Sequence, residues 1–226
     1  MITLAIDTSA HLCAAALHDG ATGAILAEHS EDIGRGHAER LMETIGQALG
    51  RAGLAYSDIA RVAASVGPGS FTGVRVGLAT ARGMALGLGV PVVGVSALDA
   101  LRAAAATADT DTPLLVALDA RRGEAYAQFF GDVAGDLPDG PFVAPCEAIA
   151  AMVGGIRDLT LCGSGAPLLV EALGRDIEIR HRLAAAPIAE YARLGAAAPV
   201  PQTRPEPLYL RPPDAKPQAG FALARA

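Results

Sequence analysis

The chain has 226 residues, 51% of them hydrophobic and 19% charged, and its formal net charge is −6. This composition provides enough apolar side chains for one large domain or two smaller lobes, and it argues against a disordered chain. All but one of the 18 basic residues are arginines, the exception being Lys216. An acidic chain has no basic field that gathers nucleic acid, so contact with RNA would need a partner's charge or a local arginine cluster.

The cysteine pattern and the apolar runs favour a reduced protein that acts in the cytoplasm. Cys13, Cys146 and Cys162 lie far apart and form no Cys-x-x-Cys pair, which argues against a metal site or a disulfide framework. The N-terminus enters a strand without a basic leader segment. The longest apolar run, 84–95, is too short and too interrupted by Gly and Pro to span a bilayer.

The first half of the chain predicts three strands and then alternating helices and strands. "ITLAIDTS" is typical of a buried strand, and 12–30 predicts a hairpin that turns between Asp19 and Gly23. Helical spacing of apolar residues predicts a helix over 36–51. Ser70 is the expected N-cap of a further helix of roughly 18 residues. The remaining elements are strands over 61–67 and 91–95 and an Ala-rich helix over 97–106.

The second half repeats the plan of an apolar strand, an Asp, a short turn and a returning strand, here over 113–130. Duplication and chance recurrence remain equal alternatives from these residues alone. The next predicted elements are a helix over 145–153, a strand over 159–163, a helix over 164–173, a strand over 177–179 and a helix over 187–194. Seven prolines in 199–217 predict an extended strap with at most a short strand at "LYL". We expect an α/β fold with two lobes, 1–106 and 107–226.

The end of the first predicted strand is one candidate anion site. Asp7 at that position is suited to hold a metal-bound phosphate or to orient a water molecule. The alternative, that it caps the turn through nearby backbone N–H groups, is favoured because the turn lacks the glycines that wrap phosphate. "GPGSFTG" offers donors at a helix N-terminus but has neither the P-loop ending nor the dinucleotide glycine spacing. The candidate anion or nucleotide contacts here are Asp7, Thr8, Ser9, Gly67, Gly69 and Ser70.

The helix predicted after Ser70 is unusually rich in glycine. Its glycines are Gly73, Gly77, Gly83 and Gly87. Each costs on the order of 1 kcal/mol relative to alanine, so close packing against another helix, of this chain or of a separate protein, is the simplest compensation. Arg75 and Arg82 share a face that can dock a partner's carboxylates. A solvated surface is the alternative for both arginines.

Two further polar clusters are ambiguous. His37 begins "HAERL", but Leu41 stands where a metal-binding histidine pair needs its second member, so His37 is interpreted as a helix-start or interface residue. "DARRGEAY" brings Asp119, Arg121, Arg122 and Glu124 to one turn. That turn either faces an anion across the lobe cleft, with Arg121 and Arg122 as contacts, or is simply solvated. The five histidines show no zinc spacing.

The motifs together resemble one family. "IDTS", "HAERL", "VGPGSFTGVRVGLATARGMALGLGVPVVGVSALDAL", "DARRGEAY" and "PLYLR" occur in the order found in the TsaB (YeaZ) family, over essentially the whole chain. The GPGSFTGxRxG block is highly specific. The resemblance implies the two-lobed ASKHA (actin-like, sugar kinase-like) fold, with duplicated mixed β-sheet cores.

The resemblance also implies a role in making N6-threonylcarbamoyladenosine at position 37 of tRNAs that read ANN codons. A TsaC-type enzyme supplies threonylcarbamoyl-AMP, TsaD transfers its threonylcarbamoyl group to the tRNA, and TsaE supplies an ATPase. TsaB is the non-catalytic paralogue that binds and supports TsaD, meets tRNA through the complex, and forms a homodimer when alone. No intrinsic cofactor or metal is implied, and ATP or ADP with Mg²⁺ at the complex interface stays open.

The implied partner surface combines the two N-terminal-lobe helices. Its expected contacts with TsaD, or with a second copy, are His37, Glu39, Leu41, Gly73, Arg75, Gly77, Thr80 and Arg82. The His-x-x-x-His metal pair of TsaD falls on Ala97 and Leu101, which cannot bind a metal, so metal-dependent transfer by this chain alone is excluded. The alternatives are an ASKHA-type ATPase or phosphotransferase that uses Asp7 and the GPG loop, and a Gcp-like peptidase, which the missing histidines disfavour most.

Overall fold

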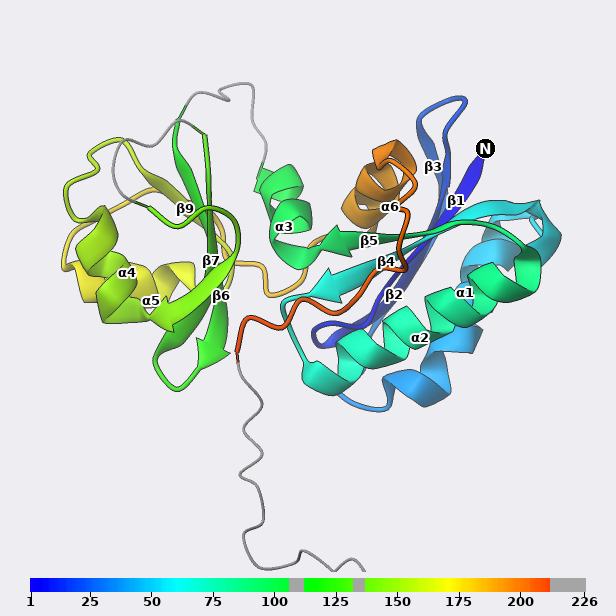
Figure 1. Ribbon diagram of the computed structural model, residues 1–226, viewed down its shortest axis with the longest axis horizontal. Coiled ribbons are helices and arrows are strands. Elements are labelled where there is room, and N and C mark those ends of the chain that lie inside the picture. Colours follow the sequence, from blue (N-terminus) through cyan, green and yellow to red (C-terminus); the bar gives the residue numbers. More distant parts are fainter. Residues whose placement is uncertain (106–111, 132–136, 212–226) are drawn as a thin grey trace, which may run out of the picture.

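The structure, a computed structural model, describes residues 1–105, 112–131 and 137–211. Two five-stranded sheets form its two lobes (Figure 1). The first sheet contains β1 (Ile2–Asp7), β2 (Leu12–Asp19), β3 (Ala24–Asp32), β4 (Ile59–Gly67) and β5 (Val92–Ser96). The second contains β6 (Leu114–Arg121), β7 (Glu124–Phe130), β8 (Phe142–Pro145), β9 (Thr160–Cys162) and β10 (Ile179–His181). The helices are α1 (His37–Ala52), α2 (Phe71–Leu88), α3 (Ala97–Ala105), α4 (Cys146–Val153), α5 (Ala166–Leu173) and α6 (Ile188–Ala197), with a 3₁₀ turn at Tyr56–Asp58.

The two sheets have the same topology. Their strand orders are β3-β2-β1-β4-β5 and β8-β7-β6-β9-β10. In each sheet three antiparallel strands are followed by two parallel strands that add beside the first strand. The repeated strand, turn and strand plan of the sequence is therefore a structural duplication, and the predicted two-lobed ASKHA architecture is confirmed.

The layers alternate helix and sheet across the molecule. The helices α1 and α2 cover one face of the first sheet, and α4 and α5 pack on the second. Between the sheets α6 packs on β1, β2 and β4 of the first sheet, while α3 packs on β6 of the second and on α6 (Figure 1). The last helix of each lobe, α3 in the first and α6 in the second, thus packs on the sheet of the other lobe. One apolar core lies between the two lobes. No helix of the described residues is long and apolar enough to cross a bilayer.

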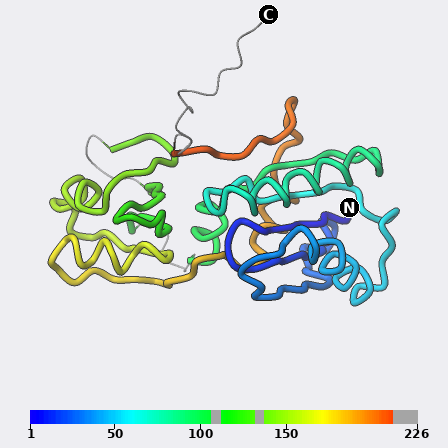
Figure 2. Tube along the Cα trace, turned by 90° about the horizontal axis from the view of Figure 1, so that it is seen from below, coloured from blue at the N-terminus to red at the C-terminus, as the bar shows by residue number. Residues whose placement is uncertain are grey.

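The strap over 199–211 joins the lobes along one side of the molecule. It leaves α6, runs beside α2 and ends at the second lobe (Figure 2). The N–H of Leu208 donates to the carbonyl of Val66 in β4 at 2.8 Å. At its end, Arg211 donates to the carbonyl of Ala120 at 3.1 Å and to Glu124. The strap therefore fixes β6 and β7 to the first lobe.

Most predicted elements are confirmed, and three details were wrong. The strand β8 was not predicted, because four residues flanked by proline are too short for a visible alternation. The strand expected over 177–179 lies at Ile179–His181, where it pairs with β9. The last helix extends to Ala197. The backbone of "LYL" bonds to β4 through Leu208 without forming a strand, in agreement with the expectation of a short strand at most. The lobe boundary expected near 107–112 lies mostly outside the described residues, so the ranges 1–106 and 107–226 stay a prediction.

Candidate docking and anion sites

The turn after β1 is held against the start of α2. The side chain of Asp7 accepts the N–H of Ser9 at 2.9 Å, as expected for a carboxylate that caps its own turn. The carbonyl of Ser9 accepts the N–H of Ser70 at 2.7 Å, and the hydroxyl of Thr8 donates to the carbonyl of Gly73 at 2.7 Å. These contacts occupy polar groups of Thr8, Ser9 and Ser70, three of the candidate anion contacts, within the chain itself.

The predicted N-cap of α2 is confirmed. The hydroxyl of Ser70 accepts the N–H of Gly73 at 3.2 Å. The GPG turn places Gly67 at φ 87°, a left-handed conformation that glycine adopts without steric cost. Gly69 and Ser70 lie at the surface, whereas Gly67 is buried. Of the predicted anion contacts around this turn, only Gly69 and Ser70 are open to solvent.

The glycines of α2 serve two different purposes. A Cβ on Gly73 would lie 1.9 Å from the carbonyl oxygen of Thr8, and one on Gly77 would lie 2.5 Å from its hydroxyl. The close neighbour of these two glycines is therefore the chain's own β1 turn, and the prediction of another helix was wrong there. A Cβ on Gly83 or Gly87 meets nothing within 4 Å, so the backbone of α2 is open at those positions.

Asp7 is buried among polar side chains, which include Ser9, Ser65 and His37. Its exposed fraction is 1%, and those of Thr8 and Ser9 are 1% and 3%. Burial raises the pKa of the Asp7 carboxyl, and its hydrogen bonds with Ser9 act in the opposite direction. Tyr191 of α6 is fully buried nearby, and burial together with the charge of Asp7 raises its pKa well above the ordinary value. An anion or nucleotide therefore has no access to Asp7 in this conformation.

The arginines of α2 contact the strap. The Arg75 guanidinium lies 3.6 Å from the centre of the Phe71 ring and donates from Nε to the hydroxyl of Tyr209 at 2.7 Å. Arg82 donates to the carbonyl of Pro205 at 3.1 Å. Neither arginine is a purely solvated residue, and both support the chain's own C-terminal strap. No sequence pattern joins residues more than 120 positions apart, so these contacts could not be predicted.

The predicted interface residues of α1 and α2 are divided between core and surface. His37, Leu41, Gly73 and Gly77 are buried within the chain, and the Nε2 atom of His37 has no hydrogen-bond partner. Glu39 and Arg75 are exposed, whereas Thr80 and Arg82 are half-buried. The prediction missed three large apolar side chains on the same helices. These are Met42, Phe71 and Leu86, which are 49%, 55% and 76% exposed.

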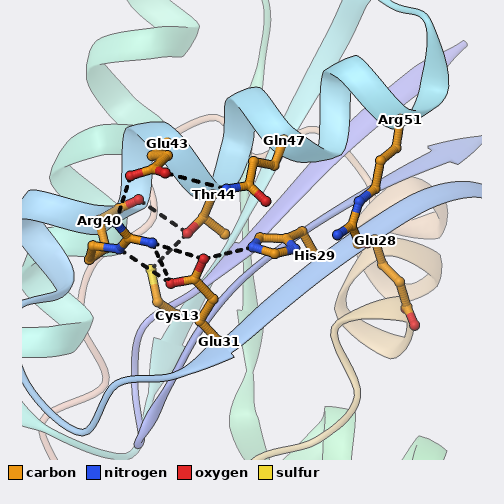
Figure 3. Close-up of polar contacts among 9 residues, drawn as sticks. All are labelled: Cys13, Glu28, His29, Glu31, Arg40, Glu43, Thr44, Gln47 and Arg51. Atoms are coloured by element: carbon orange, nitrogen blue, oxygen red, sulfur yellow. Dashed lines mark hydrogen bonds and ion pairs between the residues drawn. The ribbon is translucent and has the colours of Figure 1, made fainter.

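A charged network fixes α1 to the edge strand β3 (Figure 3). Arg40 donates to Glu31 at 2.8 Å and to Glu43 at 2.7 Å. His29 contacts Glu31 at 2.9 Å. This hydrogen bond, and to a smaller extent that of Arg40, lowers the pKa of the Glu31 carboxyl. Arg51 donates to the carbonyl of Glu28 further along the helix. The network sets the position of the outer face of α1.

The turn between β6 and β7 is strained. Arg121 and Arg122 have φ angles of 66° and 58°, a left-handed conformation that costs a residue with a side chain about 1 to 2 kcal/mol. The carboxylate of Asp119 accepts the N–H of Arg121 at 2.7 Å and lies 3.4 Å from its guanidinium. The hydroxyl of Ser164 accepts the N–H of Asp119 at 3.2 Å. Both arginines of the turn are exposed, as predicted for residues that face solvent or an anion.

Fold and contacts together define a two-lobed α/β protein whose β1 turn is sealed by a glycine-rich helix. The sequence model of TsaD, tRNA N6-adenosine threonylcarbamoyltransferase, matches residues 26–141. The tRNA threonylcarbamoyladenosine biosynthesis protein TsaB of Escherichia coli is 41% identical over 127 residues, 56% of this chain and 53% of that protein. An uncharacterized Mycobacterium tuberculosis protein is 32% identical over 96% of this chain and 94% of its own length.

A solved structure agrees with these relatives. YeaZ from Pseudomonas aeruginosa is 31% identical and superimposes with a TM-score of 0.71, covering 85% of this chain and 89% of that chain. The chain belongs to the TsaB/YeaZ family, and its resemblance to that family is confirmed. The match spans about half the length of the E. coli protein.

Proposed function

We propose that this chain is a non-catalytic subunit that binds a TsaD-type protein through the outer faces of α1 and α2. In that complex it supports N6-threonylcarbamoylation of adenosine 37 in tRNAs that read ANN codons, in the cytoplasm. Membership of the TsaB/YeaZ family supports a role in threonylcarbamoyladenosine biosynthesis. The observation that carries the docking surface is the exposure of Met42, Phe71 and Leu86 on two neighbouring helices.

The open glycines of α2 support close approach by a partner helix. Gly83 and Gly87 present bare backbone within the same helix that exposes Leu86. A helix interior disfavours glycine by about 1 kcal/mol per residue, and no described residue packs within 4 Å of the Cβ position at Gly83 or Gly87 to offset that cost. Packing against a second protein would offset it. We define the docking face as Met42 of α1 together with Phe71, Gly83, Leu86 and Gly87 of α2.

The absence of catalysis is part of the proposal. Ala97 and Leu101, which stand where TsaD carries its metal-binding histidines, are apolar and buried in α3. Asp7, the acid that an ATPase would need, is closed off by α2 and α6. The chain would therefore contribute surface and positioning to its partner, while the partner supplies the reacting groups.

The assembly includes further components. A TsaE-type ATPase joins the pair, with ATP or ADP and Mg²⁺ bound at the assembled interface, and a TsaC-type enzyme supplies threonylcarbamoyl-AMP. When no TsaD-type protein is present, a second copy of the chain binds the same face. The homodimer and the heterodimer therefore compete for one surface.

Reconstitution tests this function. Unmodified tRNA is incubated with threonine, bicarbonate, ATP and purified TsaC-, TsaD- and TsaE-type proteins, with and without this chain, and modified adenosine is measured. We expect modification to depend on the chain, and equal yields in its absence would overturn the proposal. Mg-ATP hydrolysis by the chain alone that disappears in Asp7→Asn would instead establish the ATPase alternative.

A further inference from the structure

The β6–β7 turn carries arginine where hairpins normally carry other residues. Two-residue turns with two consecutive left-handed residues strongly prefer Asn-Gly, because those residues tolerate positive φ. Here the two central residues are Arg122 and Gly123, so arginine stands where asparagine is preferred, and Arg121, the last residue of β6, also has a positive φ. Backbone strain of this kind persists where the surrounding structure enforces it, and it is concentrated at functional sites.

The surrounding contacts hold the turn in one conformation. The carboxylate of Asp119 accepts the N–H of Arg121, and Arg211 of the strap donates to the carbonyl of Ala120 at the end of β6. The side chain of Arg121 is nevertheless 86% exposed. The result is a hairpin tip that is held beside the end of the strap and presents an exposed arginine side chain.

We propose that the tip formed by Arg121 and Arg122 binds phosphates of an RNA backbone, and this rests on the proposed function in tRNA modification. Arginine forks match phosphate geometry, and a rigid turn presents them with little loss of side-chain freedom. An acidic protein segment is a weaker match. Protein interfaces centre on buried apolar anchors, and neither β6 nor β7 exposes a large apolar side chain.

The overall acidity of the chain gives this tip a limited role. With a net charge of −6, the chain does not attract RNA over its whole surface. The tip would instead contact one or two phosphates of a tRNA that the TsaD-type partner holds. Such contacts fix the position of an RNA without selecting its sequence.

The test replaces both strained arginines by asparagine, which tolerates positive φ better than arginine does. Arg121→Asn with Arg122→Asn removes both charges, places Asn-Gly at the centre of the turn and relieves strain, so the melting temperature should rise. The probe is a fluorescent, unmodified transcript of a tRNA that reads ANN codons, titrated against the chain alone and against its complex with the TsaD-type protein. We expect affinity to fall on the order of tenfold or more at 0.1 M salt, and the slope of log affinity against log salt to fall by about 1.4 to 1.8.

Two further variants complete the test. Arg121→Gln removes one charge and should change the slope about half as much as the double variant does. Arg157→Asn with Arg182→Asn removes two exposed arginines elsewhere in the chain and should bind tRNA like the wild type. Unchanged affinity and slope in the double-asparagine variant, an equal loss in the Arg157 and Arg182 control, or no tRNA binding by the wild-type complex would each overturn the proposal. Co-elution of the double-asparagine variant with the TsaD-type protein reports separately on the docking function.

Discussion

The hydroxyl of Tyr209 accepts a 2.7 Å hydrogen bond from Arg75, which joins the strap to the second helix. The Arg75 guanidinium also lies over the Phe71 ring, and the rings of Phe71 and Tyr209 are 5.7 Å apart. The aromatic end of the docking face is thus built from two segments distant in the sequence. Tyr209 of the strap therefore lies directly beside the docking face and supports Phe71.

The contact between Arg75 and Tyr209 can be measured by a double-mutant cycle. Tyr209→Phe removes the hydroxyl but keeps the contact between the tilted rings, and we expect it to lower the free energy of unfolding by about 0.5 to 1 kcal/mol, because the pair is exposed. In an Arg75→Ala background the same change should cost almost nothing. Urea unfolding of the four proteins measures the coupling, and fully additive effects would show that the bond does not stabilise the strap.

The two classes of glycine in α2 should respond oppositely to the same substitution. Gly73→Ala places a methyl group against the carbonyl of Thr8, and we expect a loss of about 1 to 3 kcal/mol or more in unfolding free energy. Gly87→Ala places it in open space and should stabilise the chain by about 0.8 to 1 kcal/mol through helix propensity. Chemical denaturation of both variants provides the comparison. Similar effects at the two positions would contradict the packing described for the β1 turn.

The buried carboxyl of Asp7 should make stability depend on pH. Its pKa is raised in the folded protein, so the folded state binds the proton more tightly than the unfolded state. Its stabilising contribution is present below the unfolded pKa, near 4, and is lost as pH rises through the folded pKa, with a slope of at most about 1.4 kcal/mol per pH unit.

Asp7→Asn isolates this contribution because it keeps the acceptor for the N–H of Ser9 and cannot ionise. The unfolding free energy of the variant minus that of the wild type should increase as pH rises from 4 to 7. Unfolding curves at several pH values give the difference. If it does not change with pH, the carboxyl has the same pKa in both states and the described burial has no electrostatic effect.

Local sequence signals predicted most of the fold. The N-cap at Ser70, the helical spacing in α1 and α2, and the turn between Asp19 and Gly23 act over a few residues and were visible directly. The duplication could be recognised only from the matching topology of both sheets, because a sequence pattern of a strand, an Asp and a turn also recurs by chance. The packing of α3 on the second sheet and of α6 on the first depends on long-range contacts, which no local sequence pattern encodes.

The candidate sites were less predictable because their contacts are non-local. The spacing of Gly73 and Gly77 indicated close packing, but only the structure identifies Thr8 as the neighbour. The strain at Arg121 and Arg122 was hidden because arginine carries no turn signal. Exposed apolar residues such as Leu86 lie off the buried stripe of α2 and can be recognised only when that stripe is placed against the sheet.

Docking through the outer face of α2 is tested most directly by an arginine at Gly83. A side chain introduced at position 83 would project into open space. Because arginine is also a better helix former than glycine, Gly83→Arg should be at least as stable as the wild type. Gly155→Arg is the matched control, because that glycine is also exposed, has open space around its Cβ and lies beyond α4 in the second lobe. Gly77→Arg is unsuitable, since it would collide with Thr8 within the chain.

The measurement is co-elution with the purified TsaD-type protein in size-exclusion chromatography. The docking proposal predicts that the wild type and Gly155→Arg co-elute with the partner, whereas Gly83→Arg, folded by its circular dichroism and melting temperature, elutes alone. Undiminished co-elution of a folded Gly83→Arg variant would contradict the assignment of this face to the partner.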